Sequence, residues 1–207
     1  MDVFAEIAVE RRALADELTS LTPQQRSTQS LCSAWTVHDV LAHLVMPLEV
    51  SLPRVVLAVL VAGGNFDRAN QRVTRTLARR PFGELCRALR EGADSRFTPP
   101  GAGPQAPLVD VLVHRADIRR PLGLRHEIPA PRARSALEFL VTSPSGLVPR
   151  GALSGLRLTA QDVGFAHGDG PEVSGPVDAL LLAVTGRTAG LEDLTGEGVD
   201  LLRARIA

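Results

Sequence analysis

Apolar residues recur every three or four positions through most of the first half of the chain, which predicts amphipathic helices. The segments with this spacing are 2–20, 36–62, 66–79, 81–93 and 108–119. Because Pro81 only interrupts the third helix, we expect residues 81–93 to continue it, and the pattern amounts to four helices. Segments 23–34 and 97–107 are polar or rich in proline and glycine, which is typical of loops.

The second predicted helix has a defined start and an interrupted middle. Thr36 is a suitable N-cap, and Asp39 follows it in the acidic position of a capping box. Pro47 and Pro53 predict a kink or break within an otherwise buried helix. The prolines and charged residues also make this apolar run unsuited to cross a bilayer, so we expect no membrane partner.

The pattern changes after Pro129 and Pro131, where we expect a linker. Beyond a helix at 131–142, alternating apolar and polar residues predict strands, and helical spacing then returns. The predicted strands are 153–160, 163–166 and 172–173, and the last helices are 177–185 and 197–206. The sequence therefore predicts an α+β protein, with a helical bundle in residues 1–127 and a small α/β domain in residues 128–207.

Composition limits the classes of function. The 207 residues carry 23 basic and 23 acidic side chains, so the net charge is zero and no nucleic-acid partner is expected. All basic residues are arginine. The guanidinium group is suited to bind carboxylates, so the composition is compatible with an anionic substrate. Without a signal peptide or a CxxC pair, we expect a cytoplasmic protein in which Cys32 and Cys86 are small buried residues.

Three residues on two of the predicted helices have the chemistry of a metal site. Asp110 and His114 are four residues apart, which places them on one helical face, one turn from each other. His43, on the second helix, offers a third donor. Imidazole nitrogen and carboxylate oxygen suit Zn²⁺ as well as Fe²⁺, Mn²⁺ or Ni²⁺, and three protein ligands leave an open position for water or substrate.

Simpler interpretations of the same residues stay open. His43 is also suited to be a hydrogen-bonded core histidine, and Asp110 to be a helix cap. Asp39 and His43 form a rival carboxylate–histidine pair, although Asp39 fits better as a capping residue. We expect the remaining histidines, His38, His126 and His167, to lie on the surface. His38 lies about 140° round the helix from His43, so it faces another side. His126 and His167 fall in predicted loops.

Three motifs resemble the mycothiol-dependent maleylpyruvate isomerase family, which belongs to the DinB/YfiT-like metalloenzyme superfamily. The first is Ala34-Trp35-Thr36-Val37-His38-Asp39-Val40-Leu41-Ala42-His43-Leu44. The second is Val113-His114-Arg115-Ala116-Asp117-Ile118-Arg119-Arg120-Pro121-Leu122-Gly123, and the third runs from Gly175-Pro176 to Thr185-Gly186-Arg187. They cover nearly the whole chain in the order found in the family.

The resemblance implies a fold and a set of ligands. The fold would be a DinB-like four-helix bundle followed by a small α/β domain similar to a sterol-carrier protein. The family's metal ligands carry over to His43, Asp110 and His114. Where the family usually has glutamate at the middle position, this chain has Asp110, whose side chain is one methylene shorter.

The resemblance also implies a reaction class. Members of the family use mycothiol, the low-molecular-weight thiol of actinobacteria, and the resemblance implies a divalent metal, for which zinc is expected in this chain. A thiolate would add to an electrophile, and bond rotation and elimination would complete a cis–trans isomerisation, whereas addition or displacement alone would be S-transfer. Arg187 matches a family arginine near the active site and would bind a substrate carboxylate, or else would interact with a helix C-terminus. Asp117 would orient His114 or pair with an arginine such as Arg120.

Two other functions stay open from the sequence. One is a hydrolase on the same bundle that uses metal-activated water. The other is a non-catalytic metal-binding protein. In each case we expect a monomer or homodimer.

Overall fold

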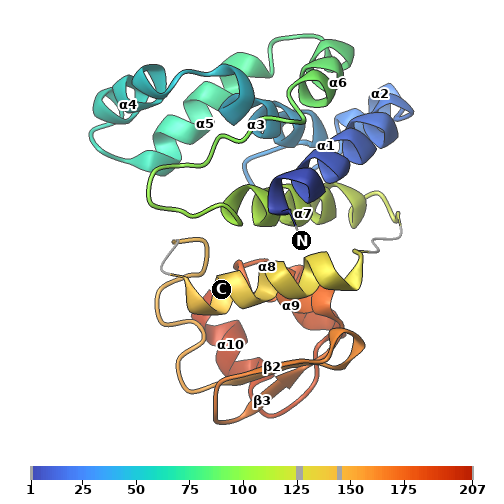
Figure 1. Cartoon of the computed structure of the whole chain (residues 1–207), viewed down its shortest axis with the longest axis vertical. Helices are drawn as coiled ribbons and strands as arrows, with labels where there is room; N and C mark the ends of the chain where they lie inside the picture. Colours follow the sequence, from blue (N-terminus) through green and yellow to red (C-terminus); the bar gives the residue numbers. More distant parts are fainter. Residues whose placement is uncertain (1, 125–127, 144–145, 207) are drawn as a thin grey trace. The chain divides into compact units, whose positions relative to one another are not determined.

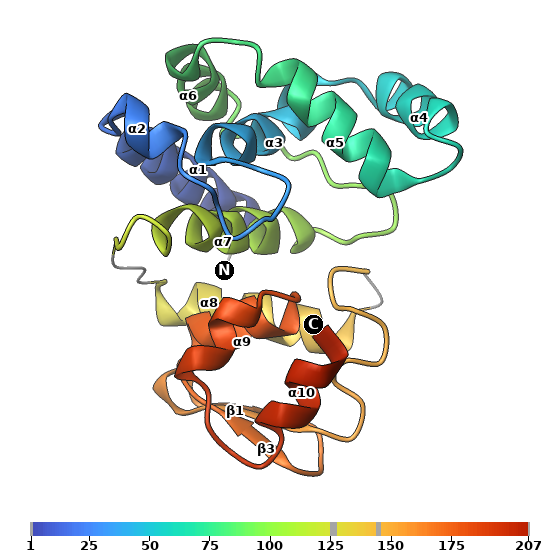
Figure 2. The same cartoon turned by 180° about the vertical axis from the view of Figure 1, so that it is seen from behind.

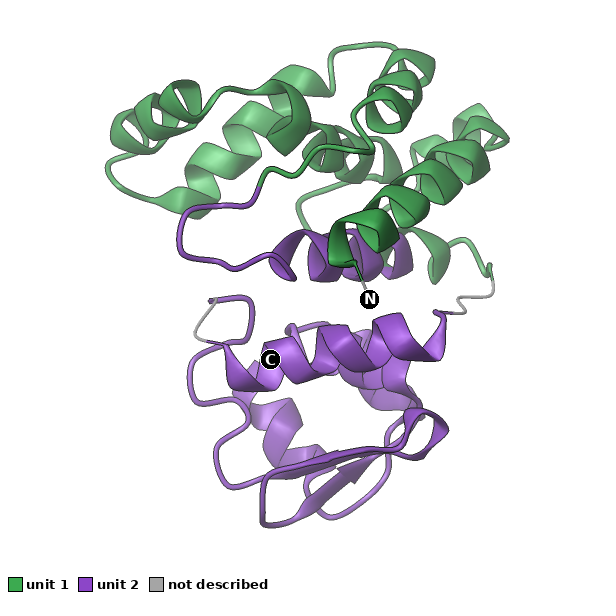
Figure 3. Cartoon of the chain, viewed as in Figure 1, with its two compact units in different colours: residues 1–97, 117–124 green, residues 98–116, 125–207 purple. Residues whose placement is uncertain are grey.

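The chain is mostly helical, with one small sheet, so the predicted α+β class is confirmed (Figure 1). The computed structural model describes residues 2–124, 128–143 and 146–206. They cluster into two compact units, residues 1–97 with 117–124 and residues 98–116 with 125–207 (Figure 3). No helix in the described residues is long and apolar enough to cross a bilayer. The predicted domain boundary after residue 127 adjoins the segment 125–127, which lies outside the described residues, and stays a prediction.

The first unit contains the predicted helices and one short helix that was not predicted. Its helices are α1 (Val3–Thr19), α2 (Pro23–Arg26), α3 (Val37–Glu49), α4 (Leu52–Val61), α5 (Phe66–Leu77) and α6 (Phe82–Glu91). Helix α2 forms in a predicted loop because Thr22 and Gln25 make a reciprocal capping box and Pro23 occupies the first turn. Figures 1 and 2 show α5 between α3 and α4, and its contacts with both helices agree.

The predicted long second helix is broken into α3 and α4. Pro53 has no N–H, so a continuous helix would leave the carbonyl of Glu49 without its usual donor. Instead the chain becomes extended at Val50, and Ser51 starts the new helix with Pro53 in its first turn. The prediction of burial holds for α3 and is wrong for α4, in which no residue is buried.

Leucines from α1, α3 and α6 form the core of the first unit. Helix α6 packs against both α1 and α3, and the fully buried leucines include Leu14, Leu41 and Leu85. Arg11 is buried beside this core, where its Nη1 donates to the carbonyls of Ala93 (3.2 Å) and Ser95 (3.0 Å). The guanidinium therefore satisfies carbonyls that follow the end of α6, while its burial adds packed surface.

The second unit contains helix α7 up to residue 116, three further helices and the sheet. Its elements, in which η denotes a short 3-10 helix, are α7 (Ala106–Arg119), α8 (Ala130–Thr142), β1 (Arg157–Ala160), η1 (Gln161–Val163), β2 (Phe165–His167), β3 (Glu172–Ser174), α9 (Val177–Val184), η2 (Thr188–Asp193) and α10 (Val199–Ile206). The last three residues of α7 cluster with the first unit.

The sheet has the strand order β2–β1–β3. Strand β1 pairs antiparallel with β2 and parallel with β3, so Leu158 lies opposite His167 on one side and Val173 on the other. Leu158 and Val173 are buried, as period-two alternation predicts. Helices α8 and α9 lie on one side of the sheet in both views (Figures 1 and 2). Strand β1 is shorter than predicted, because the chain turns at Gly151 and Gly155 before it.

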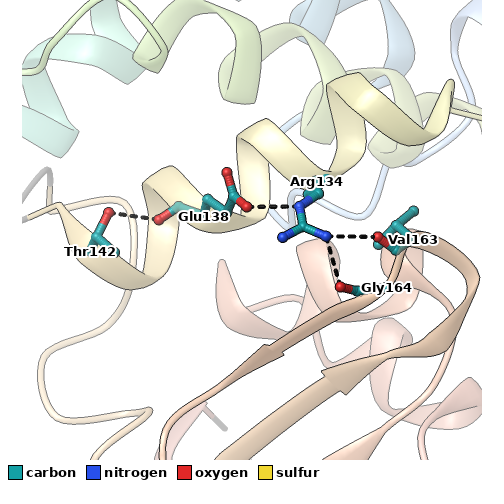
Figure 4. A network of polar contacts seen from close by, with 5 residues as sticks. All are labelled: Arg134, Glu138, Thr142, Val163 and Gly164. Atoms are coloured by element: carbon teal, nitrogen blue, oxygen red, sulfur yellow. Dashed lines mark hydrogen bonds and ion pairs between the residues drawn. The ribbon is translucent and has the colours of Figure 1, made fainter.

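Arg134 fastens α8 to the turn that precedes β2 (Figure 4). Its Nη1 donates to the carbonyls of Val163 (3.3 Å) and Gly164 (2.7 Å), and its Nε lies 2.8 Å from Oε1 of Glu138. Gly164 has a φ of +61°, a left-handed conformation that glycine adopts without strain. One planar guanidinium thus joins a helix, a carboxylate and a tight turn.

The capping box of α3 provides a test of the local energetics. We expect Thr36→Ala to lower the free energy of unfolding by about 1–2 kcal/mol, because Thr36 Oγ1 accepts from the backbone N–H of Asp39. Ser51 at the N-cap of α4 makes no side-chain capping bond, so Ser51→Ala should cost under about 0.5 kcal/mol. Urea denaturation of both variants measures the difference, and equal costs would contradict the assigned role of Thr36.

Candidate functional site

Helix α7 is buried on nearly all sides, although it carries several polar side chains along its length. Leu108, Val109 and Val111 point to different sides of the helix, and each is at most 2% exposed. A helix that is apolar all round is typical of the inside of a protein. Because α7 begins at Ala106, Asp110 lies in its second turn, and the alternative that Asp110 caps this helix is wrong.

Asp110 and His114 point toward each other along α7. Oδ1 of Asp110 lies 3.5 Å from Nε2 of His114, with 32% and 9% of the two side chains exposed. Two ligands bound to one tetrahedral zinc at about 2.0–2.2 Å are about 3.4 Å apart. The predicted pair is therefore brought together at a separation that one ion can bridge. The shorter aspartate side chain reaches the imidazole within this one helix.

His43 lies in α3, where its ring stacks on an aromatic side chain and one ring nitrogen makes a hydrogen bond. The ring is 9% exposed and stacks on Trp35, with centroids 4.7 Å apart and planes inclined by 29°. Its Nδ1 lies 3.2 Å from Oδ1 of Asn70 on α5. Since an amide oxygen accepts, Nδ1 carries the proton and Nε2 the lone pair. This is the arrangement in which a second hydrogen bond fixes the tautomer of a metal-binding histidine.

Asp39 serves as a capping residue, as predicted, and not as a partner of His43. Its Oδ2 accepts from the backbone N–H of Thr36 (2.9 Å) and from Oγ1 of Thr36 (2.7 Å). Both bonds lie at the start of α3, where unpaired N–H groups favour a carboxylate. The capping box thereby fixes the start of the helix that carries His43 four residues beyond Asp39.

Cys32 and Asp117 form a polar contact that the sequence did not predict. Sγ of Cys32 lies 3.1 Å from Oδ2 of Asp117, which is fully buried, although the two residues are 85 positions apart. Cys32 is half-buried, so the expectation that it is simply a small buried residue is wrong. Asp117 follows His114 by three residues on α7, and Cys32, Asp117 and His114 together offer a thiol, a carboxylate and an imidazole, a second group of residues that could hold a metal ion.

Cys86 fits its predicted role as a buried apolar residue. It is 4% exposed on α6, and burial raises the pKa of its thiol, an effect that a hydrogen bond with Thr19 only partly offsets. A protonated, enclosed thiol is a poor nucleophile.

Arg187 lies just beyond the C-terminus of α9. Its Nη1 donates to the carbonyl of Thr185 (2.8 Å), and its backbone N–H donates to the carbonyl of Leu182 (2.8 Å). Gly186, with a φ of +85°, allows the chain to fold back in this way. These contacts agree with the predicted interaction of Arg187 with a helix C-terminus, and the guanidinium is half-buried.

The remaining histidines have separate surroundings. His38 is half-buried, with its Nε2 3.1 Å from the carbonyl of Arg80 and its ring edge-on to Phe82. His167 is exposed as expected, although it lies in strand β2 rather than in a loop. His126 lies outside the described residues.

Asn70 and Trp35 were not identified from the sequence as parts of the site. Trp35 stood in the first motif without a role, and Asn70 interrupts an otherwise apolar stripe of α5 between Ala69 and Val73. A polar residue at such a position signals a buried partner, which in this structure is the imidazole of His43.

Comparison with known proteins finds one protein family that matches part of the chain and two solved structures with a similar fold. Residues 7–96 match the family described as mycothiol maleylpyruvate isomerase N-terminal domain. Two crystal structures of a mycothiol-dependent maleylpyruvate isomerase have the same fold, one of the enzyme (16% identity) and one of a histidine-to-alanine mutant (15%). Each match has a TM-score of 0.59 and covers 95% of this chain and 96% of that chain. By sequence, no curated protein is a significant match. The chain thus has the fold of an enzyme.

The two cysteines should differ in reactivity. We expect iodoacetamide to label Cys32 faster than Cys86, by roughly tenfold or more, because Cys86 is enclosed and its raised pKa depletes the thiolate. Labelling of Cys86 should increase only at a pH above the range of an ordinary thiol. The single variants Cys32→Ala and Cys86→Ala separate the two rates by mass spectrometry. Equal rates in the native protein would contradict the burial argument.

Proposed function

We propose that this protein is a metal-dependent enzyme that uses mycothiol, because residues 7–96 match the mycothiol maleylpyruvate isomerase N-terminal domain family. Its reaction is thiol-assisted cis–trans isomerisation of an electrophilic, anionic small molecule, or S-transfer to such a molecule. The observation that carries the proposal is the Asp110–His114 pair at 3.5 Å on a buried helix. The fold shared with a mycothiol-dependent maleylpyruvate isomerase supports the same reaction class.

The proposed architecture follows the family. Residues 1–127 form a DinB-like four-helix bundle that binds the metal, and residues 128–207 form a sterol-carrier-like α/β domain. In this architecture the four main helices would be α1, α3, α5 together with α6, and α7, and the short α2 and the separate α4 would be additions to them. In such bundles, metal sites are built from inward side chains on facing helices.

The proposed ligands are His43, Asp110 and His114, with zinc as the expected metal. Two imidazoles and one carboxylate match the donor set of catalytic zinc and leave a position for a thiol. Three features of the described residues support the fit: the 3.5 Å separation of the α7 pair, the burial of both histidines and the bond from His43 to Asn70. When bound, a divalent metal lowers the pKa of a thiol and thereby favours the thiolate.

The protein's own residues supply orientation around this centre. Asn70 holds the proton of His43 on Nδ1, and Trp35 covers one face of the ring, so the imidazole keeps one orientation. Asp117, buried three residues after His114, adds a second carboxyl group to the same helix. Because these contacts already hold the side chains in place, the site would need little rearrangement when the metal binds.

Arg187 is the proposed group for the substrate carboxylate. Its guanidinium has five N–H donors in a planar fork, and the described bond to Thr185 uses Nη1. The bond holds the side chain near the end of α9 and so limits its conformations. A charge-assisted contact from the guanidinium to the substrate carboxylate would then fix the orientation of an anionic substrate.

Metal analysis tests the ligand set. We expect the wild type to bind one zinc ion tightly, and His43→Ala, Asp110→Asn and His114→Ala to lose most of that affinity. Asn70→Leu should weaken binding by about tenfold to a hundredfold, because the orientation of His43 is lost while the ligand remains. His167→Ala, which changes an exposed histidine, is the matched control. Full metal retention by both His43→Ala and His114→Ala would show that the ligand assignment is wrong.

An assay with mycothiol and maleylpyruvate tests the reaction. We expect isomerisation only when both thiol and metal are present, and a bimane electrophile in place of maleylpyruvate tests S-transfer. Arg187→Gln should raise the KM for an anionic substrate by roughly tenfold to a hundredfold, with little change for its neutral ester.

Two outcomes of that assay would identify the alternatives. Ester hydrolysis by the metal-loaded protein without thiol would favour a hydrolase. Tight metal binding with neither hydrolysis nor consumption of thiol would favour a non-catalytic metal-binding protein. Either result would overturn the proposed use of mycothiol.

A further inference from the structure

Helix α4 exposes the largest group of apolar side chains among the described residues. Six of the eight large apolar residues that are exposed lie in α4 or at the start of α5: Leu52, Val56, Leu57, Leu60, Val61 and Phe66. Their exposed fractions reach 69% at Leu60. Soluble proteins rarely expose a contiguous apolar surface of this kind without a binding partner.

The exposure follows from the way α4 is held. Within its unit α4 packs chiefly on α5, and its half-buried residues form a narrow stripe of small and β-branched side chains. That stripe is Val55, Ala58, Val59 and Ala62. The larger leucines lie on the remaining surface of the helix, so α4 has one apolar face against α5 and another toward solvent.

Helix α5 carries a stripe of arginines on the side away from the core. Arg68, Arg72 and Arg75 recur at intervals of four and three residues, which places them on one face of α5, and Arg79 follows in the turn after the helix; all four are exposed. They line a shallow groove together with Gln71 and Thr76. The opposite face holds Asn70 and Thr74, which point into the unit.

Within the described part of the chain, these arginines form no ion pair. Among the described residues, ion pairs engage other arginines of the first unit, for example Arg80 with Glu49, but none of the four in this stripe. Residues 50–83 contain six arginines and one acidic residue, Asp67, although the whole chain is neutral. Although the net charge of the whole chain is zero, the segment 50–83, which contains α4 and α5, is therefore strongly basic.

We propose that α4 and α5 form a surface that binds an anionic phospholipid bilayer. The apolar face of α4 would lie among the headgroups, and the arginines of α5 would pair with lipid phosphates. An amphipathic helix with neighbouring cations is the usual composition of a segment that lies on a membrane. This differs from crossing the membrane, for which α4 is too short, but it departs from the expectation, drawn from the sequence, that the protein has no membrane partner.

Charge favours a lipid surface over a second copy of this chain. A symmetric dimer places the same patch on both sides of its interface, so the arginine stripe of one protomer would meet that of the other. Within α4 and α5 a single carboxylate, Asp67, stands against four arginines, which is too little to offset this repulsion. An anionic bilayer provides both the negative charge and the apolar surface that the two helices require.

Sedimentation with vesicles tests the proposal on the full chain. We expect binding to vesicles of equal parts phosphatidylcholine and phosphatidylglycerol, weak binding to phosphatidylcholine alone, and loss of binding as salt is raised. Arg72→Gln with Arg75→Gln should weaken binding roughly twenty-five-fold, since each arginine contributes about a factor of five. Leu57→Ser with Leu60→Ser should weaken it by roughly tenfold or more.

Matched variants elsewhere serve as controls. Val9→Ser with Leu201→Ser removes exposed apolar residues from other helices, and Arg150→Gln with Arg157→Gln removes exposed arginines from the second unit. Both controls should bind as the wild type does, with folding checked by circular dichroism. Absence of binding, or equal binding to neutral and anionic vesicles, would overturn the proposal. So would a dimer, measured by light scattering, that dissociates in the Leu57→Ser/Leu60→Ser variant.

Discussion

The approach of Asp110 to His114 on α7 is the interaction on which the proposed chemistry depends. Both donors come from one buried helix, so their separation is set by the helical repeat and does not require a loop to be ordered. The apolar residues around them keep the helix inside the protein, where an imidazole and a carboxylate need a partner. A divalent cation is one such partner, and the 3.5 Å distance suits it.

The surroundings of His43 show how the fold prepares a third donor. Three local features act on one ring: the Thr36–Asp39 capping box fixes the start of α3, Trp35 stacks on the imidazole, and Asn70 from α5 sets the tautomer. Each is a contact of a different kind, and each restricts a different degree of freedom. A histidine held in this way loses little further entropy when it coordinates a metal.

Local sequence patterns predicted the helices, the capping box and the α7 pair, because each depends on residues within a few positions of one another. The exposure of α4 could not be predicted, since an apolar stripe does not reveal whether anything covers it. The Cys32–Asp117 contact spans 85 residues, and the Asn70–His43 bond joins two helices, so both depend on tertiary packing. Arg187 remained ambiguous because a cation after a helix suits both the helix end and a substrate carboxylate.

X-ray absorption at the zinc edge of the metal-loaded protein tests the ligand set and the use of a thiol in one measurement. Before thiol is added, we expect two imidazoles and a carboxylate oxygen and no sulfur around the metal. Addition of mycothiol should introduce one sulfur neighbour at about 2.3 Å. A sulfur neighbour already present without mycothiol would point instead to Cys32 with Asp117 and His114. A spectrum unchanged by mycothiol would contradict binding of the thiol at the metal.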